Sequence, residues 1–160
     1  FFAKCEEVGV DGIIIPDLPF EEKKEVDEPA LAHNVTLISM IAPTSEERIQ
    51  RIASEAKGFL YVVSSLGVTG VRTQITTDLD SIVKNIRKAT NIPCAIGFGI
   101  STPDQAAKMA AVSDGSIVGS AIVKIIAQHG KEAGPVISEY VKRMKDAVAG
   151  VSSNNNNALL

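Results

Sequence analysis

The fold is decided by a strand–helix–strand pattern in residues 92–123, which read IPCAIGFGISTPDQAAKMAAVSDGSIVGSAIV. Two short apolar runs, 92–101 and 115–123, lie on either side of an amphipathic stretch at 102–112. Each run is apolar at consecutive positions over its middle, as is typical of a buried parallel strand. The stretch therefore predicts one βαβ unit.

The same alternation continues toward the start of the chain. Three more apolar runs precede the first unit, namely GIIIPDLP (12–19), VTLISMIAP (35–43) and GFLYVVSS (58–65). Amphipathic stretches that predict helices follow them, at 21–33, 45–57 and 79–90. Strict alternation of strands and helices predicts a parallel sheet with right-handed crossovers.

The predicted helices begin and pack in recognisable ways. Ser45 and Thr102 are hydroxyl residues placed just before acidic residues, a pattern typical of helix N-caps. After the last strand, helices are expected at 122–129 and 135–149. The second carries one apolar face, which predicts packing against the body of the domain and consists of Ile137, Tyr140, Val141, Met144 and Val148.

Five βα units fit into 160 residues, whereas a closed (β/α)8 barrel needs eight units and typically about 250 residues. The fold class is therefore α/β, as an open sheet or as part of a parallel TIM barrel with about five units and a C-terminal helix. The chain opens without Met inside a helix-like stretch, FFAKCEEVG, which favours the part-barrel. We expect residues 1–150 to form this domain and 151–160, VSSNNNNALL, to be a disordered tail.

Composition excludes several classes of function. The formal net charge is −3, which argues against a nucleic-acid partner. No apolar run approaches the roughly 20 residues needed to cross a bilayer, so no membrane partner is expected. Cys5 and Cys94 show neither metal-ligand spacing nor a disulfide framework, which predicts a cytoplasmic protein without a metal site.

Three glycine-containing turns follow consecutive predicted strands. They are Gly67-Val68-Thr69-Gly70, Gly97-Phe98-Gly99-Ile100-Ser101 and Gly119-Ser120-Ala121. The first opens a long Gly- and Thr-rich loop at 66–77, and loops of that length are usually functional. Glycine lets backbone N–H groups approach an anion closely, and a helix N-terminus adds unpaired donors. Together the turns predict a phosphate-binding site at the carboxyl ends of the strands.

Four stretches of the chain resemble the tryptophan synthase alpha subunit family, in the order found in that family. They read GIIIPDLPFEE (12–22), SSLGVTGVR (64–72), AIGFGIS (95–101) and VGSAIVKII (118–126). The resemblance runs from Phe1 to about Ala149. It implies a TIM-barrel lyase of tryptophan biosynthesis that cleaves indole-3-glycerol phosphate to indole and glyceraldehyde 3-phosphate. It also implies a heterotetramer with a beta subunit, which holds the pyridoxal phosphate, so that this chain needs no cofactor.

The resemblance also implies roles for individual residues. The phosphate would bind to Gly70, Gly99, Gly119 and Ser120, while Gly97 and Phe98 shape the turn and Phe98 lies beside the indole or glycerol part. Thr69 corresponds to the threonine of the lid loop. Substrate-lining positions would be Tyr61, Ile14, Met40 and Ile117, and the beta-subunit face would include Asp17 and Pro19.

Alternatives remain open for several of these residues. Met40 and Ile117 could be ordinary core residues, and Tyr61 could be either core or pocket lining. Asp17 could be a catalytic carboxylate or a structural acid paired with a neighbouring loop. Ser120 could cap a helix, which is compatible with phosphate binding.

The glutamate and aspartate that form the family's acid/base pair lie upstream of this sequence. No catalytic residue is therefore assigned here, and we expect the 160-residue chain alone to be inactive. Two other interpretations stay open: a different phosphate-binding TIM-barrel enzyme, and a non-catalytic part-barrel that binds a partner or self-associates.

Overall fold

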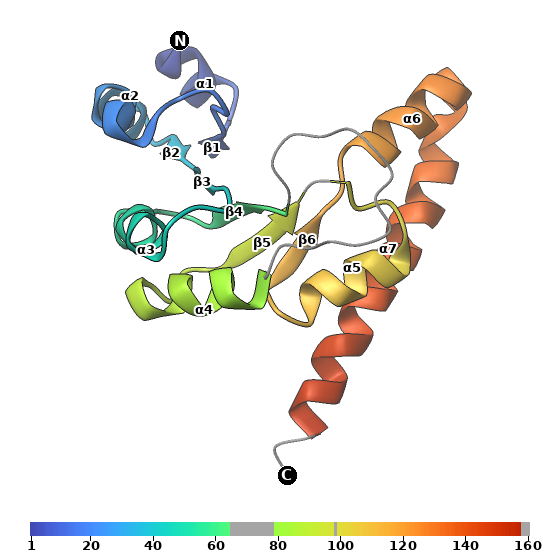
Figure 1. The fold of residues 1–160 in the computed structure, drawn as a ribbon. Coiled ribbons are helices and arrows are strands. Elements are labelled where there is room, and N and C mark those ends of the chain that lie inside the picture. Colours follow the sequence, from blue (N-terminus) through green and yellow to red (C-terminus); the bar gives the residue numbers. More distant parts are fainter. Residues whose placement is uncertain (65–78, 98, 158–160) are drawn as a thin grey trace.

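The computed structural model describes residues 1–64, 79–97 and 99–157, and shows helices and short parallel strands in alternation (Figure 1). The strands are β1 (Gly12–Ile13), β2 (Thr36–Leu37), β3 (Ser39–Ile41), β4 (Leu60–Val63), β5 (Cys94–Gly97) and β6 (Gly115–Ile117). The α-helices are α1 (Phe2–Glu7), α2 (Lys23–Leu31), α3 (Glu46–Ser54), α4 (Leu79–Ala89), α5 (Pro103–Ala110), α6 (Ser120–His129) and α7 (Ala133–Asn157). Two 3₁₀ turns, η1 (Phe20–Glu22) and η2 (Gly130–Glu132), precede α2 and α7.

The strands are hydrogen-bonded in the order in which they occur along the chain. One sheet contains β1 and β2, the other runs β3-β4-β5-β6, and every pairing is parallel. β2 and β3 are one strand interrupted at Ile38, so five strands follow one another without reversal. A doubly wound sheet reverses its order, whereas the wall of a barrel does not. The predicted parallel arrangement is confirmed.

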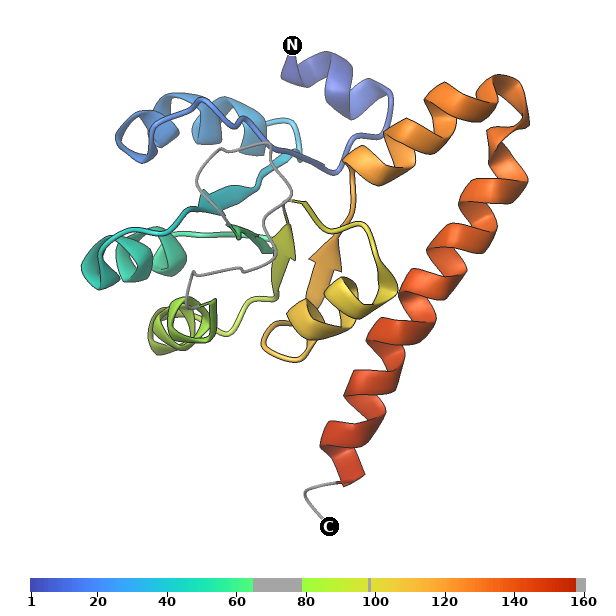
Figure 2. The same ribbon diagram turned by 45° about the vertical axis from the view of Figure 1, so that its right-hand side comes forward.

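The core lies between the four-stranded sheet and the helices that cover one of its faces (Figure 2). Ile41, Val62 and Ile96 are fully buried and lie side by side in register on that face. They pack against apolar residues of the helices, which include Ile49, Ile52, Ile82, Ile86 and Met109. On the opposite face the side chains are only half-buried, which leaves that face available to line a site.

The predicted helix caps are present. The Ser45 hydroxyl accepts a hydrogen bond of 3.3 Å from the Arg48 amide at the start of α3. Thr102 and Gln105 form a reciprocal capping box at the start of α5, with Pro103 at its first position. These bonds satisfy first-turn N–H groups that would otherwise have no partner in the helix.

One predicted helix differs from the structure. The expected helix at 21–33 is a 3₁₀ turn followed by α2, which contains Pro29 and ends at Leu31. The last described helix, α7, continues to Asn157, and residues 158–160 lie outside the described part of the chain. Extending a helix that already exists avoids the cost of nucleation, so even a polar sequence can continue it.

A charge run at 21–27 links neighbouring helices. Lys23 is only 8% exposed and its Nζ donates to the Glu55 carbonyl at 2.8 Å. Glu21 accepts two hydrogen bonds from Arg48, at 2.8 and 3.2 Å. α2 is therefore attached to α3 by its charged side.

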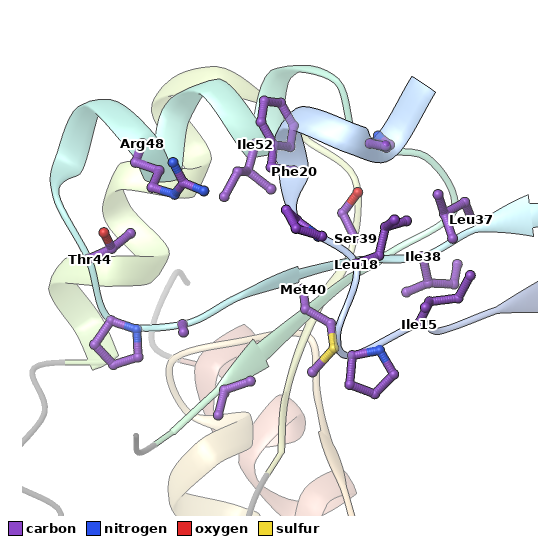
Figure 3. A pocket seen from close by; sticks show the side chains of 16 residues that line it. Ile15, Leu18, Phe20, Leu37, Ile38, Ser39, Met40, Thr44, Arg48 and Ile52 are labelled. Atoms are coloured by element: carbon purple, nitrogen blue, oxygen red, sulfur yellow. The ribbon is translucent and has the colours of Figure 1, made fainter. Parts of the chain in front are cut away.

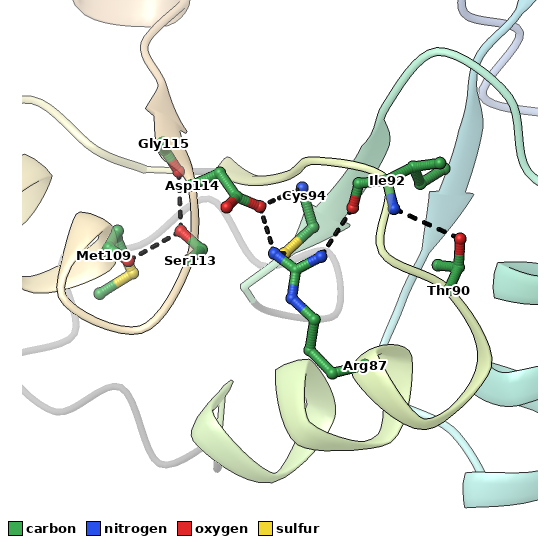
Figure 4. A network of polar contacts seen from close by, with 8 residues as sticks. All are labelled: Arg87, Thr90, Ile92, Cys94, Met109, Ser113, Asp114 and Gly115. Carbon is green, nitrogen blue, oxygen red and sulfur yellow. Dashed lines mark hydrogen bonds and ion pairs between the residues drawn. The ribbon is translucent and has the colours of Figure 1, made fainter.

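A polar network joins the amino ends of β5 and β6 (Figure 4). The Arg87 guanidinium pairs with Asp114 and donates to the Ile92 carbonyl at 2.7 Å. Asp114 also accepts a 2.7 Å hydrogen bond from the Cys94 amide. Although burial raises the pKa of Asp114, the bonds from Cys94 and Arg87 outweigh it and hold that pKa below its usual value.

Candidate functional site

The candidate site lies at the carboxyl ends of the strands. Because every strand pair is parallel, these ends meet at one edge of the sheet. Gly97 ends β5 and Gly99 follows it, while Gly119 and Ser120 follow the neighbouring strand β6. The structure therefore brings two of the three predicted glycine turns together on adjacent strands.

Two rows of residues, most of them half-buried, lie on the sheet face opposite the helices. Met40, Tyr61 and Ala95 are in register across β3, β4 and β5. The next row toward the carboxyl ends contains Gly97 and Ile117, again in register. The structure thus places Met40, Tyr61, Gly97 and Ile117 on one face, as the predicted substrate-lining role requires.

Tyr61 and Gly97 are in close contact. A Cβ atom built on Gly97 would lie 2.6 Å from Cζ of Tyr61, nearer than any real side chain approaches. The phenol ring therefore leans from β4 across β5 toward the carboxyl end, and glycine is needed to make room for it. The sequence motif identifies Gly97 as a turn residue, but this packing role depends on strand register.

The loop after β5 is hydrogen-bonded to side chains of two helices, α5 and α7. Gly99 has a φ of +74°, a conformation that favours glycine. The Gln105 side-chain oxygen accepts from the Ser101 and Thr102 amides, at 2.9 and 3.2 Å. From α7, the Tyr140 hydroxyl donates to the Ser101 carbonyl at 2.9 Å, and burial raises the pKa of that hydroxyl.

The turn after β6 leads directly into a ten-residue helix. Gly119 is the N-cap of α6, and its carbonyl accepts from the Ile122 and Val123 amides at 2.9 and 3.1 Å. No side chain caps this helix, and both Gly119 and Ser120 are exposed. The first N–H groups of α6 are therefore directed to solvent at the positive end of the helix dipole, where an anion is stabilised.

The remaining predicted site residues either lie outside the described residues or belong to the segment after β1. Thr69, Gly70 and Phe98, with the loop at 66–77, lie outside the described residues. Ile14 follows β1 and is exposed, and Asp17 is exposed in the next turn. Pro19 precedes η1 and lines a cavity that Met40 also lines.

That cavity, of about 470 Å³, opens between the segment after β1 and strand β3 (Figure 3). Met40 and Ser39 point to opposite sides of β3 there, and Arg48 contributes from α3. The hydrogen bond from Arg48 lowers the pKa of Glu21. The sequence does not predict this cavity, because its lining comes from the segment after β1, from β3 and from α3, and no local pattern relates these segments.

Within the part of the chain that the structure describes, no cluster of three or more His, Cys, Asp or Glu residues could hold a metal ion. Among the described helices, none combines the length and the apolar character needed to span a bilayer.

Comparison with known proteins gives one family. The family model described as tryptophan synthase alpha chain matches residues 1–151. A tryptophan synthase alpha chain from Lactiplantibacillus plantarum is 52% identical over 152 residues, which are 94% of this chain and 57% of the relative. One from Thermoanaerobacter pseudethanolicus is 52% identical over 149 residues, or 93% of this chain and 55% of the relative.

Solved structures give the same result. The tryptophan synthase alpha subunit from Campylobacter jejuni superimposes with a TM-score of 0.73 at 34% identity, covering 92% of this chain and 56% of that one. A Pyrococcus furiosus structure described as a tryptophan synthase α2β2 complex gives 0.78 at 32% identity, covering 91% and 60%. The predicted fold class, part of a TIM barrel, is confirmed. The chain spans about half the length of the curated relatives that it matches.

Proposed function

Because this chain belongs to the tryptophan synthase alpha chain family, we propose that it is the substrate-holding part of a carbon–carbon lyase of tryptophan biosynthesis. Its substrate is indole-3-glycerol phosphate, which the complete enzyme cleaves to indole and glyceraldehyde 3-phosphate. The observation that carries the proposal is the juxtaposition of two glycine turns, after β5 and β6, at one edge of the sheet.

The phosphate binds to backbone and hydroxyl groups of Gly99, Gly119 and Ser120, together with Gly70 from the loop at 66–77. The uncapped N-terminus of α6 supports this role, because its dipole contributes roughly 0.3–1 kcal/mol to anion binding and up to about 2 kcal/mol when partly buried. Charge-assisted hydrogen bonds from N–H groups to phosphate oxygens add to this.

The indole part lies against the half-buried face of the sheet. Met40, Tyr61 and Ile117 supply an apolar surface below the phosphate. In the complete enzyme we expect Phe98 and Ile14 to line the same pocket. Thr69 acts from the lid loop. Holding the two ends of the substrate orients the bond to be cleaved, which is a contribution to rate that needs no proton transfer.

Cleavage itself requires groups that move protons at the indole ring and the glycerol hydroxyl. The family's glutamate and aspartate supply them from a part of the barrel that this chain does not contain. The chain alone is therefore expected to bind the substrate without turning it over, so that it acts as a binding fragment.

The partner of the complete enzyme is a beta subunit that holds pyridoxal phosphate, in a heterotetramer. The Pyrococcus furiosus relative described as an α2β2 complex supports this partner. The contact face includes Asp17 and Pro19, which lie in the turn after β1. Two buried free cysteines fit a cytoplasmic location, where thiols remain reduced.

Calorimetry with glycerol 3-phosphate and with indole-3-glycerol phosphate tests the proposal. We expect both ligands to bind, the second more tightly because it also covers the apolar face, and we expect no indole release. Glycerol without the phosphate is the control and should not bind. Absence of phosphate-dependent binding would contradict the proposed function, and indole release at the rate of a complete relative would contradict the predicted inactivity.

A further inference from the structure

A buried hydroxyl group without a hydrogen-bond partner faces the cavity of about 470 Å³ beside β3. Ser39 is only 8% exposed, and none of the described residues forms a hydrogen bond with its Oγ atom. It is in register with Leu60 of the core, so its side chain points toward the helices. Figure 3 shows this oxygen on the opposite side of β3 from Met40. Because burying a hydroxyl without a hydrogen bond is unfavourable, this group is suited to bind a ligand.

The same cavity is lined by a buried ammonium group. Lys23 is also 8% exposed, and its Nζ donates to the Glu55 carbonyl at 2.8 Å. That hydrogen bond uses one of the three N–H donors of the ammonium group. Among the described residues, no carboxylate forms an ion pair with Lys23. A buried charge is costly unless an opposite charge compensates it, so the cavity favours an anionic group.

The rest of the lining limits the ligand further. Among the described residues, no Asp or Glu lines the cavity, and the second cation there, Arg48, already pairs with Glu21 at 2.8 Å. The other side chains of the lining are mainly apolar and include Leu18, Phe20, Leu37 and Ile52. The volume of the cavity is in the range that holds small organic molecules. A fitting ligand therefore carries one negative charge on an apolar body.

We propose that this cavity binds an aromatic monocarboxylate, whose carboxylate accepts hydrogen bonds from Lys23 Nζ and Ser39 Oγ. The aromatic body occupies the apolar space between the segment after β1 and α3. This second site is distinct from the proposed phosphate site, because Ser39 lies on the helix-facing side of β3, whereas the glycine turns follow β5 and β6.

Calorimetry with naphthoate tests the proposal, with naphthamide as the neutral probe of the same shape. We expect naphthoate to bind at least about tenfold more tightly than naphthamide, because only the carboxylate compensates the buried charge. Saturating glycerol 3-phosphate should leave the naphthoate affinity unchanged. Equal affinity for the two probes, or competition by glycerol 3-phosphate, would overturn the proposal. Failure of glycerol 3-phosphate itself to bind would contradict only the proposed function.

Two substitutions locate the site. Lys23→Met and Ser39→Ala should each weaken naphthoate binding at least about tenfold, because each removes a donor to the carboxylate. Lys24→Met, at the exposed neighbouring lysine, is the charge-matched control and should leave the affinity unchanged. Ser39→Ala removes a hydroxyl that has no partner among the described residues, so it should not lower the urea midpoint. Unchanged affinity in Ser39→Ala, or an equal loss in Lys24→Met and Lys23→Met, would overturn the assignment.

Discussion

The amino and carboxyl ends of strands β5 and β6 differ in how their polar groups are hydrogen-bonded. At the amino ends, Arg87, Asp114 and backbone groups of Ile92 and Cys94 satisfy one another in a closed network (Figure 4). At the carboxyl ends, Gly99, Gly119 and Ser120 present an exposed backbone, and α6 begins without a side-chain cap. The first end uses its polar groups internally, whereas the second leaves them available to a ligand.

This difference indicates that the two ends of each strand have different roles. In barrels, residues at the amino ends contribute mainly to stability and those at the carboxyl ends to binding and chemistry. Substitutions at the two ends should therefore separate stability from ligand binding.

Gly97→Ala should have the largest effect, because it lowers both folding stability and substrate affinity. The new Cβ would overlap the Tyr61 ring, and overpacking of this kind typically costs about 1–3 kcal/mol of folding free energy. Displacement of the ring should also weaken substrate binding. Urea denaturation and calorimetry measure the two effects.

The matched control is Gly115→Ala in the neighbouring strand, where a Cβ would meet nothing within 4 Å. A Gly97→Ala protein as stable as Gly115→Ala would show that the contact between Tyr61 and Gly97 is not restrictive.

Ser120→Asp should lower phosphate affinity and raise folding stability. A carboxylate at the first position of α6 repels phosphate, and we expect affinity for glycerol 3-phosphate to fall at least tenfold. The same carboxylate interacts favourably with the helix dipole, so stability should rise by roughly 0.3–1 kcal/mol. Unchanged phosphate affinity in calorimetry would remove α6 from the proposed site, and Ser120→Ala separates loss of the hydroxyl from gain of charge.

Asp114→Asn should lower stability by at most about 1 kcal/mol at neutral pH, because the ion pair with Arg87 is half-exposed. Phosphate affinity should not change. The pKa of Asp114 is lowered on folding from 3.8, so its contribution is present above pH 3.8 and disappears as the pH falls through the folded-state pKa. Urea midpoints of wild type and variant should therefore differ near neutral pH and converge below pH 3.8. Asp146→Asn, at an exposed position on α7, is the matched control.

The parts of the fold that were predictable depend on local patterns. Apolar runs and capping residues locate each strand and the starts of α3 and α5, because these signals lie within a few residues. The interruption at Ile38 and the 3₁₀ turn at Phe20–Glu22 depend on how neighbouring segments pack, and the sequence around them carries no signal for either.

In the candidate site, too, the features that could be predicted depend on local patterns. The glycine turns after β5 and β6 are visible in the sequence as motifs, and their meeting at one edge follows from parallel topology. The restriction of Gly97 by Tyr61 depends on register, and the Arg87–Asp114 pair joins residues 27 positions apart. Neither was predicted, because contacts between distant residues leave no periodic pattern.

The hydrogen bond from Tyr140 to Ser101 has a consequence for the order in which the protein is made. Chains emerge from the ribosome amino end first, so β5 and its loop are synthesised before α7. Until Tyr140 emerges, the loop that carries Gly99 lacks one of its two attachments. Full attachment of that loop is thus tied to synthesis of α7, and a nascent chain stopped before α7 would have its strands in place with one attachment of the loop still missing.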